Sequence, residues 1–219
     1  MSSIKHKKTA QSPRDSIQDL LRQIQEYKPA HGEFSYAERE RAVTEAQRLF
    51  KEASWLARQF PVNEDLPRAS ATAQQLWYAA MEAAYPDGFW EDVRKRRTGD
   101  AASLESVVSF LEADPYFFRS GYTKAWLIRG IKPPMLTPAY QKRLQQVVLA
   151  LVDKRDDRDF RAFCKLARKV DDAGFREQLR QRADEGNFDV RRRAWWVLDA
   201  LAQKDQMAQG RKKAEESPQ

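Results

Sequence analysis

The stretch Phe110–Ile131, FLEADPYFFRSGYTKAWLIRGI, decides the fold that we expect of this chain. Apolar residues run into it at the i, i+3, i+4, i+7 spacing of a helix that buries one face, at Leu104, Val107, Val108 and Leu111. Asp114-Pro115 ends that helix, because the residue before a proline is pushed out of the α conformation. A second stripe opens at Tyr122 and Trp126. We therefore expect a helix, a tight corner and a second helix, with aromatic side chains filling the angle.

The same helical pattern covers the rest of the chain, and no segment shows the sustained period-two alternation of a β-strand. Capping residues mark several predicted helix starts, namely Ser35, Thr137-Pro138 and Asp171-Asp172. We expect an all-α protein of roughly ten helices, built either as stacked antiparallel helix pairs or as an irregular helical bundle. The predicted parts are a disordered basic tail at 1–11, N-terminal helices at 12–60, a helical domain at 70–205 that is either separate from or continuous with them, and a disordered tail at 206–219.

The composition is that of a folded, soluble protein, with 42% hydrophobic and 32% charged residues among 219. The net charge of +7 is concentrated in the tails, since residues 1–14 carry four cations and no acid while residues 15–209 sum to only +2. No apolar run approaches the ~18 residues of a membrane span, and the polar N-terminus is no secretory signal. Cys164 is the single cysteine, which excludes an intramolecular disulfide. These features predict a cytoplasmic protein.

An apolar residue followed by arginine recurs near several predicted helix starts, at Val93-Arg94, Phe118-Arg119, Phe160-Arg161 and Val190-Arg191. Acidic residues precede each of them. The best instance lies within residues 187–201, where Asp189-Val190-Arg191 is followed by Ala194 and Leu198; this segment resembles the second helix of a HEAT-type repeat. The resemblance extends loosely over about 90–205. It implies stacked helix pairs, a curved surface and a role in binding rather than in chemistry.

Side chains for catalysis or metal binding are sparse. The two histidines, His6 and His31, have no partner histidine at helical spacing, and Cys164 falls on an apolar stripe. The carboxylate pairs Glu112/Asp114 and Glu91-Asp92 would suit glycoside or base-excision chemistry, but any helical protein rich in Glu and Asp offers such pairs. Asp114 is most simply a cap of the turn at Pro115. We therefore expect no cofactor, no metal ion and no catalytic residue.

Aromatic residues and arginines, which dominate the energetics of protein interfaces, are plentiful. The first functional hypothesis is thus a non-enzymatic helical scaffold that binds another protein, as an adaptor, an inhibitor or an immunity-type protein. Its candidate protein-binding residues are Tyr116, Phe117, Arg119, Tyr122, Trp126, Arg192 and Trp196.

The alternative hypothesis is a nucleic-acid-binding protein, including a DNA-repair enzyme similar to the glycosylases that are built from HEAT-like helix pairs. Its candidate residues form two basic runs, Arg94, Lys95, Arg96, Arg97 and Arg191, Arg192, Arg193, the second followed by Trp195-Trp196. One of these two tryptophans is expected in the core. The near-neutral body argues against a broad phosphate track. A third alternative is a homo-oligomer whose aromatic patch meets its own copy.

Overall fold

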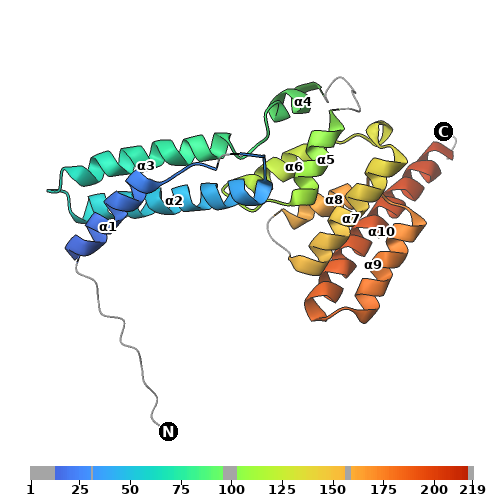
Figure 1. The fold of residues 1–219 in the computed structure, drawn as a ribbon. Coiled ribbons are helices and arrows are strands. Elements are labelled where there is room, and N and C mark those ends of the chain that lie inside the picture. The colour runs from blue at the N-terminus through green and yellow to red at the C-terminus, as the bar shows by residue number, and fades with distance from the viewer. Residues whose placement is uncertain (1–12, 31, 96–102, 156–158, 217–219) are drawn as a thin grey trace, which may run out of the picture. The chain divides into compact units, whose positions relative to one another are not determined.

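The computed structural model describes residues 13–30, 32–95, 103–155 and 159–216, which are mostly helical (Figure 1). These residues form ten α-helices, a short 3-10 helix and no β-strand. The helices are α1 (Pro13–Glu26), α2 (Tyr36–Gln59), α3 (Asp65–Glu82), α4 (Phe89–Lys95), α5 (Leu104–Ala113), α6 (Ser120–Gly130), η2 (Pro133–Met135), α7 (Pro138–Lys154), α8 (Phe160–Ala167), α9 (Ala173–Glu185) and α10 (Phe188–Glu216). The all-α fold predicted from the sequence is confirmed. Among the helices so described, none is long and apolar enough to cross a lipid bilayer.

The chain divides into two compact units between Pro86 and Asp87. The division lies C-terminal to the link at 61–70, which the sequence offers as one possible boundary. The N-terminal unit includes α3, which packs along the length of α2 (Figure 1). The helix also begins earlier than expected, at Asp65, so that Pro67 lies in its first turn. A proline is tolerated there because the first backbone N–H groups of a helix have no partner within it.

The N-terminal unit is a helical hairpin of α2 and α3 against which α1 packs. Its core consists of small and branched apolar residues, which let the helices approach closely: Leu20, Ile24, Leu49, Ala53, Leu56, Leu66, Ala69 and Ala73. Ser35, predicted as the cap at the start of α2, lies at that position, but its side chain makes no capping hydrogen bond.

The helices of the C-terminal unit lie in two rows. In one, which we call the odd row, α5 contacts α7 and α7 contacts α9; in the other, the even row, α6 contacts α8 and α8 contacts α10. The rows pack on each other through α7 with α8 and through α9 with α10. The apolar stripes predicted for α5 and α7 are buried, at Leu104, Val107, Val108, Leu111, Leu144, Val147, Val148 and Leu151. Each row therefore covers the apolar face of the other.

Cationic side chains join helices of the C-terminal unit by donating to carbonyl oxygens at helix ends. Lys169 Nζ donates to the carbonyl of Ile128 at the end of α6, over 2.8 Å. Arg193 Nε donates to the carbonyl of Val152 at the end of α7, over 2.6 Å. The last carbonyls of a helix have no α-helical donor within it, and these cations supply one; the carbonyl of Ile128 also accepts from the backbone N–H of Ile131.

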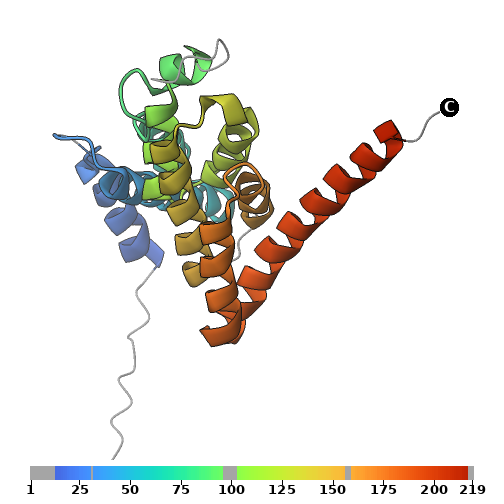
Figure 2. The same cartoon turned by 90° about the vertical axis from the view of Figure 1, so that its right-hand side faces the viewer.

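Helix α10 continues to Glu216, well past the point at 206 where the sequence predicts a disordered tail. Among the residues whose side chains the structure describes, the last that link α10 to the body are Lys204 and Asp205, which pair with Asp171 and Arg176. Residues 206–210 are exposed. Figure 2 shows the C-terminal part of α10 running clear of the other helices of its unit.

Candidate functional site

The central corner, residues 114–119, joins α5 to α6 within the C-terminal unit. Asp114 ends α5 in the left-handed conformation, with φ 46°, and Arg119 precedes α6 with φ 66°. Both are non-glycine residues in a region of backbone space that costs free energy, so the surrounding contacts must hold them there. Phe117 supplies one such contact, because its buried backbone N–H donates to Ser120 Oγ over 3.1 Å.

A buried ionic cluster holds this corner against α8. Lys124, on α6, has no exposed surface; its Nζ lies 2.5 Å from Asp114 Oδ1 and 3.8 Å from Asp159 Oδ2. Arg155 completes the cluster, with Nη2 at 2.6 Å from Asp114 Oδ1 and Nη1 at 3.6 Å from Asp159 Oδ1. Two cations thus face two carboxylates, and their charges cancel. Asp114 was expected to cap the turn at Pro115. Instead its carboxylate pairs with Lys124 and Arg155, which the sequence did not reveal.

The predicted carboxylate pair of Glu112 and Asp114 does not converge on one site. Glu112 Oε2 pairs with Arg143 Nη2 at 2.6 Å, while Asp114 faces Lys124 and Arg155. Arg143 also bonds Glu105 and lowers the pKa of that carboxyl to about 2. Glu105 and Glu112 thus link α5 to α7 through Arg143, and Asp114 belongs to the ionic cluster.

The protein-binding residues predicted in the corner separate into different environments. Phe117 is core, with 7% of its surface exposed, so its predicted place at an interface is wrong. Tyr116 is exposed and has the Arg155 guanidinium 5.3 Å from its ring centroid. Arg119 lies over the ring of Phe118 in the same way, at 5.4 Å. The corner thus holds its surface rings against its own arginines.

Tyr122 and Trp126 lie one turn apart on the outward face of α6, and Tyr122 is 72% exposed. Trp126 is joined by Trp90 from α4, whose ring centroid lies 6.2 Å away. Trp90 was not among the predicted binding residues. It lies two helices before α6 in the chain, and no sequence pattern indicates that it packs beside Trp126. These three rings form the aromatic strip of α6.

A second strip runs along α10, where Phe188, Arg192 and Trp196 recur every four residues. The Arg192 guanidinium lies 5.9 Å from the ring of Phe188 and 5.1 Å from that of Trp196. Trp196 also meets Phe160 of α8 edge to face, at 5.8 Å. Phe188 is 78% exposed and is a further residue that sequence reasoning missed. Both Trp195 and Trp196 are exposed, so the expectation that one of them is core is wrong.

The basic run Arg191–Arg193 does not form a shared basic surface. Arg191 Nε donates to the carbonyl of Ala183 at 3.1 Å, and Arg193 is buried on the carbonyls of α7. Arg192 Nη2 pairs with Asp189 at 3.2 Å. Two of the three predicted nucleic-acid contacts are therefore committed to the protein's own backbone.

The other basic run lies partly outside the described residues, which end at Lys95 and resume at Ser103, so that Arg96 and Arg97 are not placed. Arg94 is exposed near the end of α4, and Lys95 Nζ pairs with Glu91 at 3.0 Å.

The N-terminal unit exposes Trp55, Val62 and Tyr78, whereas within the C-terminal unit the large exposed apolar side chains are confined to one part. They occur at Trp90, in the corner, on α6 and on α10, whereas α5, α7 and α9 expose none. The odd row is thus polar on its outside, and the even row carries the aromatic strips. Between these strips, the outward face of α8 presents Arg161 and Lys165. We call the outward faces of α6, α8 and α10, with Trp90, the aromatic face.

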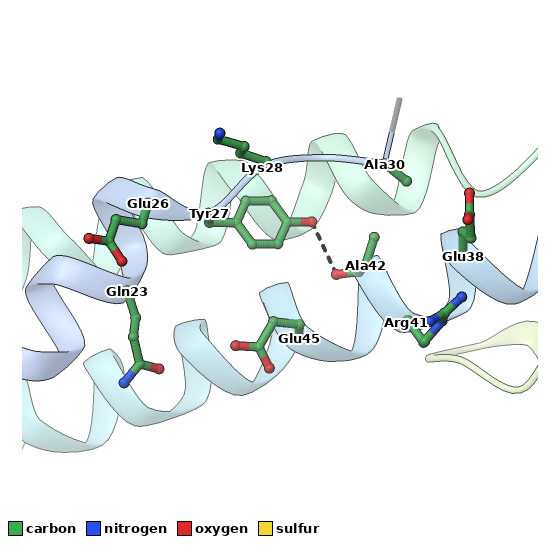
Figure 3. Close-up of a pocket in the computed structure, with 9 residues that line it drawn as sticks. All are labelled: Gln23, Glu26, Tyr27, Lys28, Ala30, Glu38, Arg41, Ala42 and Glu45. Carbon is green, nitrogen blue, oxygen red and sulfur yellow. Dashed lines mark hydrogen bonds between the residues drawn. The ribbon is translucent and has the colours of Figure 1, made fainter. Parts of the chain in front are cut away.

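Each unit also has an open hollow of its own. The hollow in the N-terminal unit has a volume of about 510 Å³. Figure 3 shows Tyr27, which follows α1, pointing toward α2, where its Oη donates to the carbonyl of Ala42 over 3.1 Å. Charges of both signs line this hollow, from Glu26, Glu38, Glu45, Lys28 and Arg41. The other, of about 470 Å³, lies between α9 and α10 beside Trp195. Neither brings together a catalytic set.

Metal and thiol chemistry find no support among the described residues. No three His, Cys, Asp or Glu side chains in that part of the chain lie close enough to hold a metal ion. Burial raises the pKa of the Cys164 thiol to about 11, so that it is protonated at neutral pH. His6 and His31 lie outside the described residues.

Comparisons of the chain with protein-family models, with curated proteins and with solved structures find no match.

Proposed function

We propose that this protein is a helical scaffold that binds another protein through the aromatic face. The observation that carries the proposal is that, within the C-terminal unit, the exposed aromatic side chains lie on the even row, in the corner that leads into it and at Trp90, and none lies on the odd row. Scattered single apolar residues are normal on a protein surface, but rings gathered on one row, with a polar opposite row, are typical of an interaction surface.

The packing of the strips fits this role. Trp126 rests on Trp90, and Trp196 rests on Phe160 and Arg192, so these rings are held in place before any partner arrives. Rigid aromatic side chains lose little conformational entropy on binding and are frequent hot spots in interfaces.

The two-row packing supports the HEAT-like architecture that the sequence suggests. The Asp–apolar–Arg pattern heads α8 and α10, and Phe118-Arg119 precedes α6, so three instances mark successive helices of the even row. The arginines nevertheless act differently: Arg161 is exposed, Arg191 donates to a carbonyl and Arg119 lies over a ring. The proposal of a repeat rests on arrangement rather than on a shared contact.

The nucleic-acid alternative has less support, because Arg191 and Arg193 donate to backbone carbonyls. A phosphate track needs several free cations in a row.

Site-specific photocrosslinking in the native cell tests the proposal. A benzophenone side chain at Tyr122 or Phe188 is expected to give a discrete crosslinked product with one and the same partner. Gln146 of α7 and Gln181 of α9 are matched controls, since both are exposed on the odd row. Equal products from all four positions, or none from the aromatic face, would refute a binding role for this face.

A further inference from the structure

We propose that the partner presents an acidic segment to the aromatic face, with carboxylates on Arg161 and Lys165 and apolar side chains on the flanking strips. This inference rests on the binding role proposed above and adds the chemistry of the partner.

Helix α8 supplies the central charges. It buries Phe160, Phe163 and Leu166 toward the body, which leaves Arg161 and Lys165 on the opposite, exposed face. These two residues are four apart and so neighbour each other on the helix surface. No carboxylate among the described residues forms an ion pair with either of them. Their charges are available to a ligand.

Helices α6 and α8 carry no opposing charge near these cations. The sequences of α6, SGYTKAWLIRG, and of α8, FRAFCKLA, contain no acidic residue. Arg129 adds an exposed cation on α6. On α10, the nearby Asp189 is paired with Arg192. The exposed charged side chains of α6 and α8 are therefore cationic. They favour a partner whose contacting surface is negatively charged.

The order across the even row is aromatic, cationic, aromatic. Because α8 contacts both α6 and α10 and packed helix axes lie ~8–10 Å apart, the two strips are roughly 20 Å apart. An extended chain covers that distance in about six residues. One short segment with acidic residues in its middle and apolar residues at its ends can therefore reach all three helices.

Single-stranded nucleic acid would also stack on aromatic rings, but its phosphates continue past any three helices and need further cations. Three further cations are committed within the protein: Lys124 to the ionic cluster, and Lys169 and Arg193 to carbonyl oxygens. The short row of free cations fits a few carboxylates better than a phosphate backbone.

The test uses the full chain and a random copolymer of glutamate and tyrosine as the probe, with binding followed by fluorescence anisotropy. The double variant Arg161→Gln/Lys165→Gln is expected to weaken binding by about fivefold or more, since each exposed ion pair contributes a modest part of the affinity. Trp126→Ser is expected to weaken it too, with circular dichroism showing that both variants remain folded.

The basic N-terminal tail requires a matched control, because it could attract the same polymer. Lys7→Gln/Lys8→Gln removes the same charge and is expected to change the affinity less than twofold. An equal loss in both double variants would overturn the inference by locating the binding in the tail. So would wild-type protein that fails to bind the copolymer.

A polyglutamate without tyrosine and an oligothymidine of similar charge complete the experiment. Both are expected to bind more weakly than the copolymer. If the oligonucleotide binds as tightly or more tightly at the same residues, the ligand of this face is nucleic acid and not an acidic protein segment. The photocrosslinking result is independent of these outcomes, because a partner can contact Tyr122 and Phe188 without being acidic.

Discussion

Lys124 decides the conformation of the central corner. Removing an ammonium group from water costs free energy unless charged partners replace the solvent, and here Asp114 and Asp159 do so. The same contacts hold Asp114 in its left-handed conformation, because they fix its side chain. The ionic cluster therefore links the end of α5, at Asp114, to the start of α8, at Asp159.

We predict that Lys124→Met destabilises the C-terminal unit by about 3–5 kcal/mol, as expected when one member of a buried ion pair is removed. The methionine fills a similar volume, so the loss reports charge rather than packing. Urea unfolding followed by circular dichroism measures it. Arg180→Gln, which breaks an exposed pair with Glu177, is the control and is expected to cost less than about 1 kcal/mol.

The double variant Lys124→Met/Asp114→Asn is expected to lose less than the sum of its single variants, because each single change leaves an unmatched charge. Additive losses would show that Lys124 and Asp114 do not act together.

Capping shows what a sequence can and cannot tell about an element. Thr137-Pro138 and Asp172 were predicted as caps, and their side chains accept from Tyr140 N at 3.3 Å and Phe175 N at 2.8 Å. Ser35 belongs to an equally good pattern, but its side chain makes no such bond. A capping motif in the sequence indicates which side chain can accept a hydrogen bond at the helix start. The contacts of the preceding loop determine whether that side chain is oriented to accept it.

We predict that Thr137→Ala destabilises the protein by about 1 kcal/mol, the usual cost of losing a side-chain cap. Ser35→Ala is expected to cost only a few tenths of a kcal/mol, because there is no capping bond to lose. Urea midpoints of the two variants, compared with the wild type, provide the measurement. A loss at Ser35 as large as that at Thr137 would contradict the description of α2.

The length of α10 was missed for a physical reason. A polar sequence without an apolar stripe was read as a tail, yet Gln, Ala, Lys and Glu are all good helix formers. Once residues 188–205 are held by packing, the helix propagates without paying again for nucleation. Periodicity detects helices that bury a face, so an exposed continuation escapes it.

At the scale of the molecule, helical periodicity was enough to predict an all-α fold of roughly ten helices. The division at Pro86, and the choice between stacked helix pairs and an irregular bundle, were beyond reach, because both depend on which helices pack together. The exposed side of α10 shows the same limit: Trp195 and Trp196 are identical in type, and only the positions of α8 and α9 determine that neither is buried.

The division into two units predicts that residues 87–219 fold without the N-terminal unit. Such a fragment is expected to retain a helical circular dichroism spectrum and a cooperative urea transition, since its two rows cover each other. The complementary fragment, residues 1–86, has its own apolar core and serves as a companion measurement. A non-cooperative transition of the longer fragment would show that its core is incomplete.

The projecting end of α10 gives the C-terminal unit a stiff arm. The eleven residues from Gln206 to Glu216 extend it by roughly 16 Å at the rise of an α-helix. Because a continuous helix transmits rotation where a coil would not, a dye attached near Met207 tumbles with the whole unit. A partner that binds to the C-terminal unit therefore slows the rotation of a dye on this arm, although the dye lies away from the binding surface.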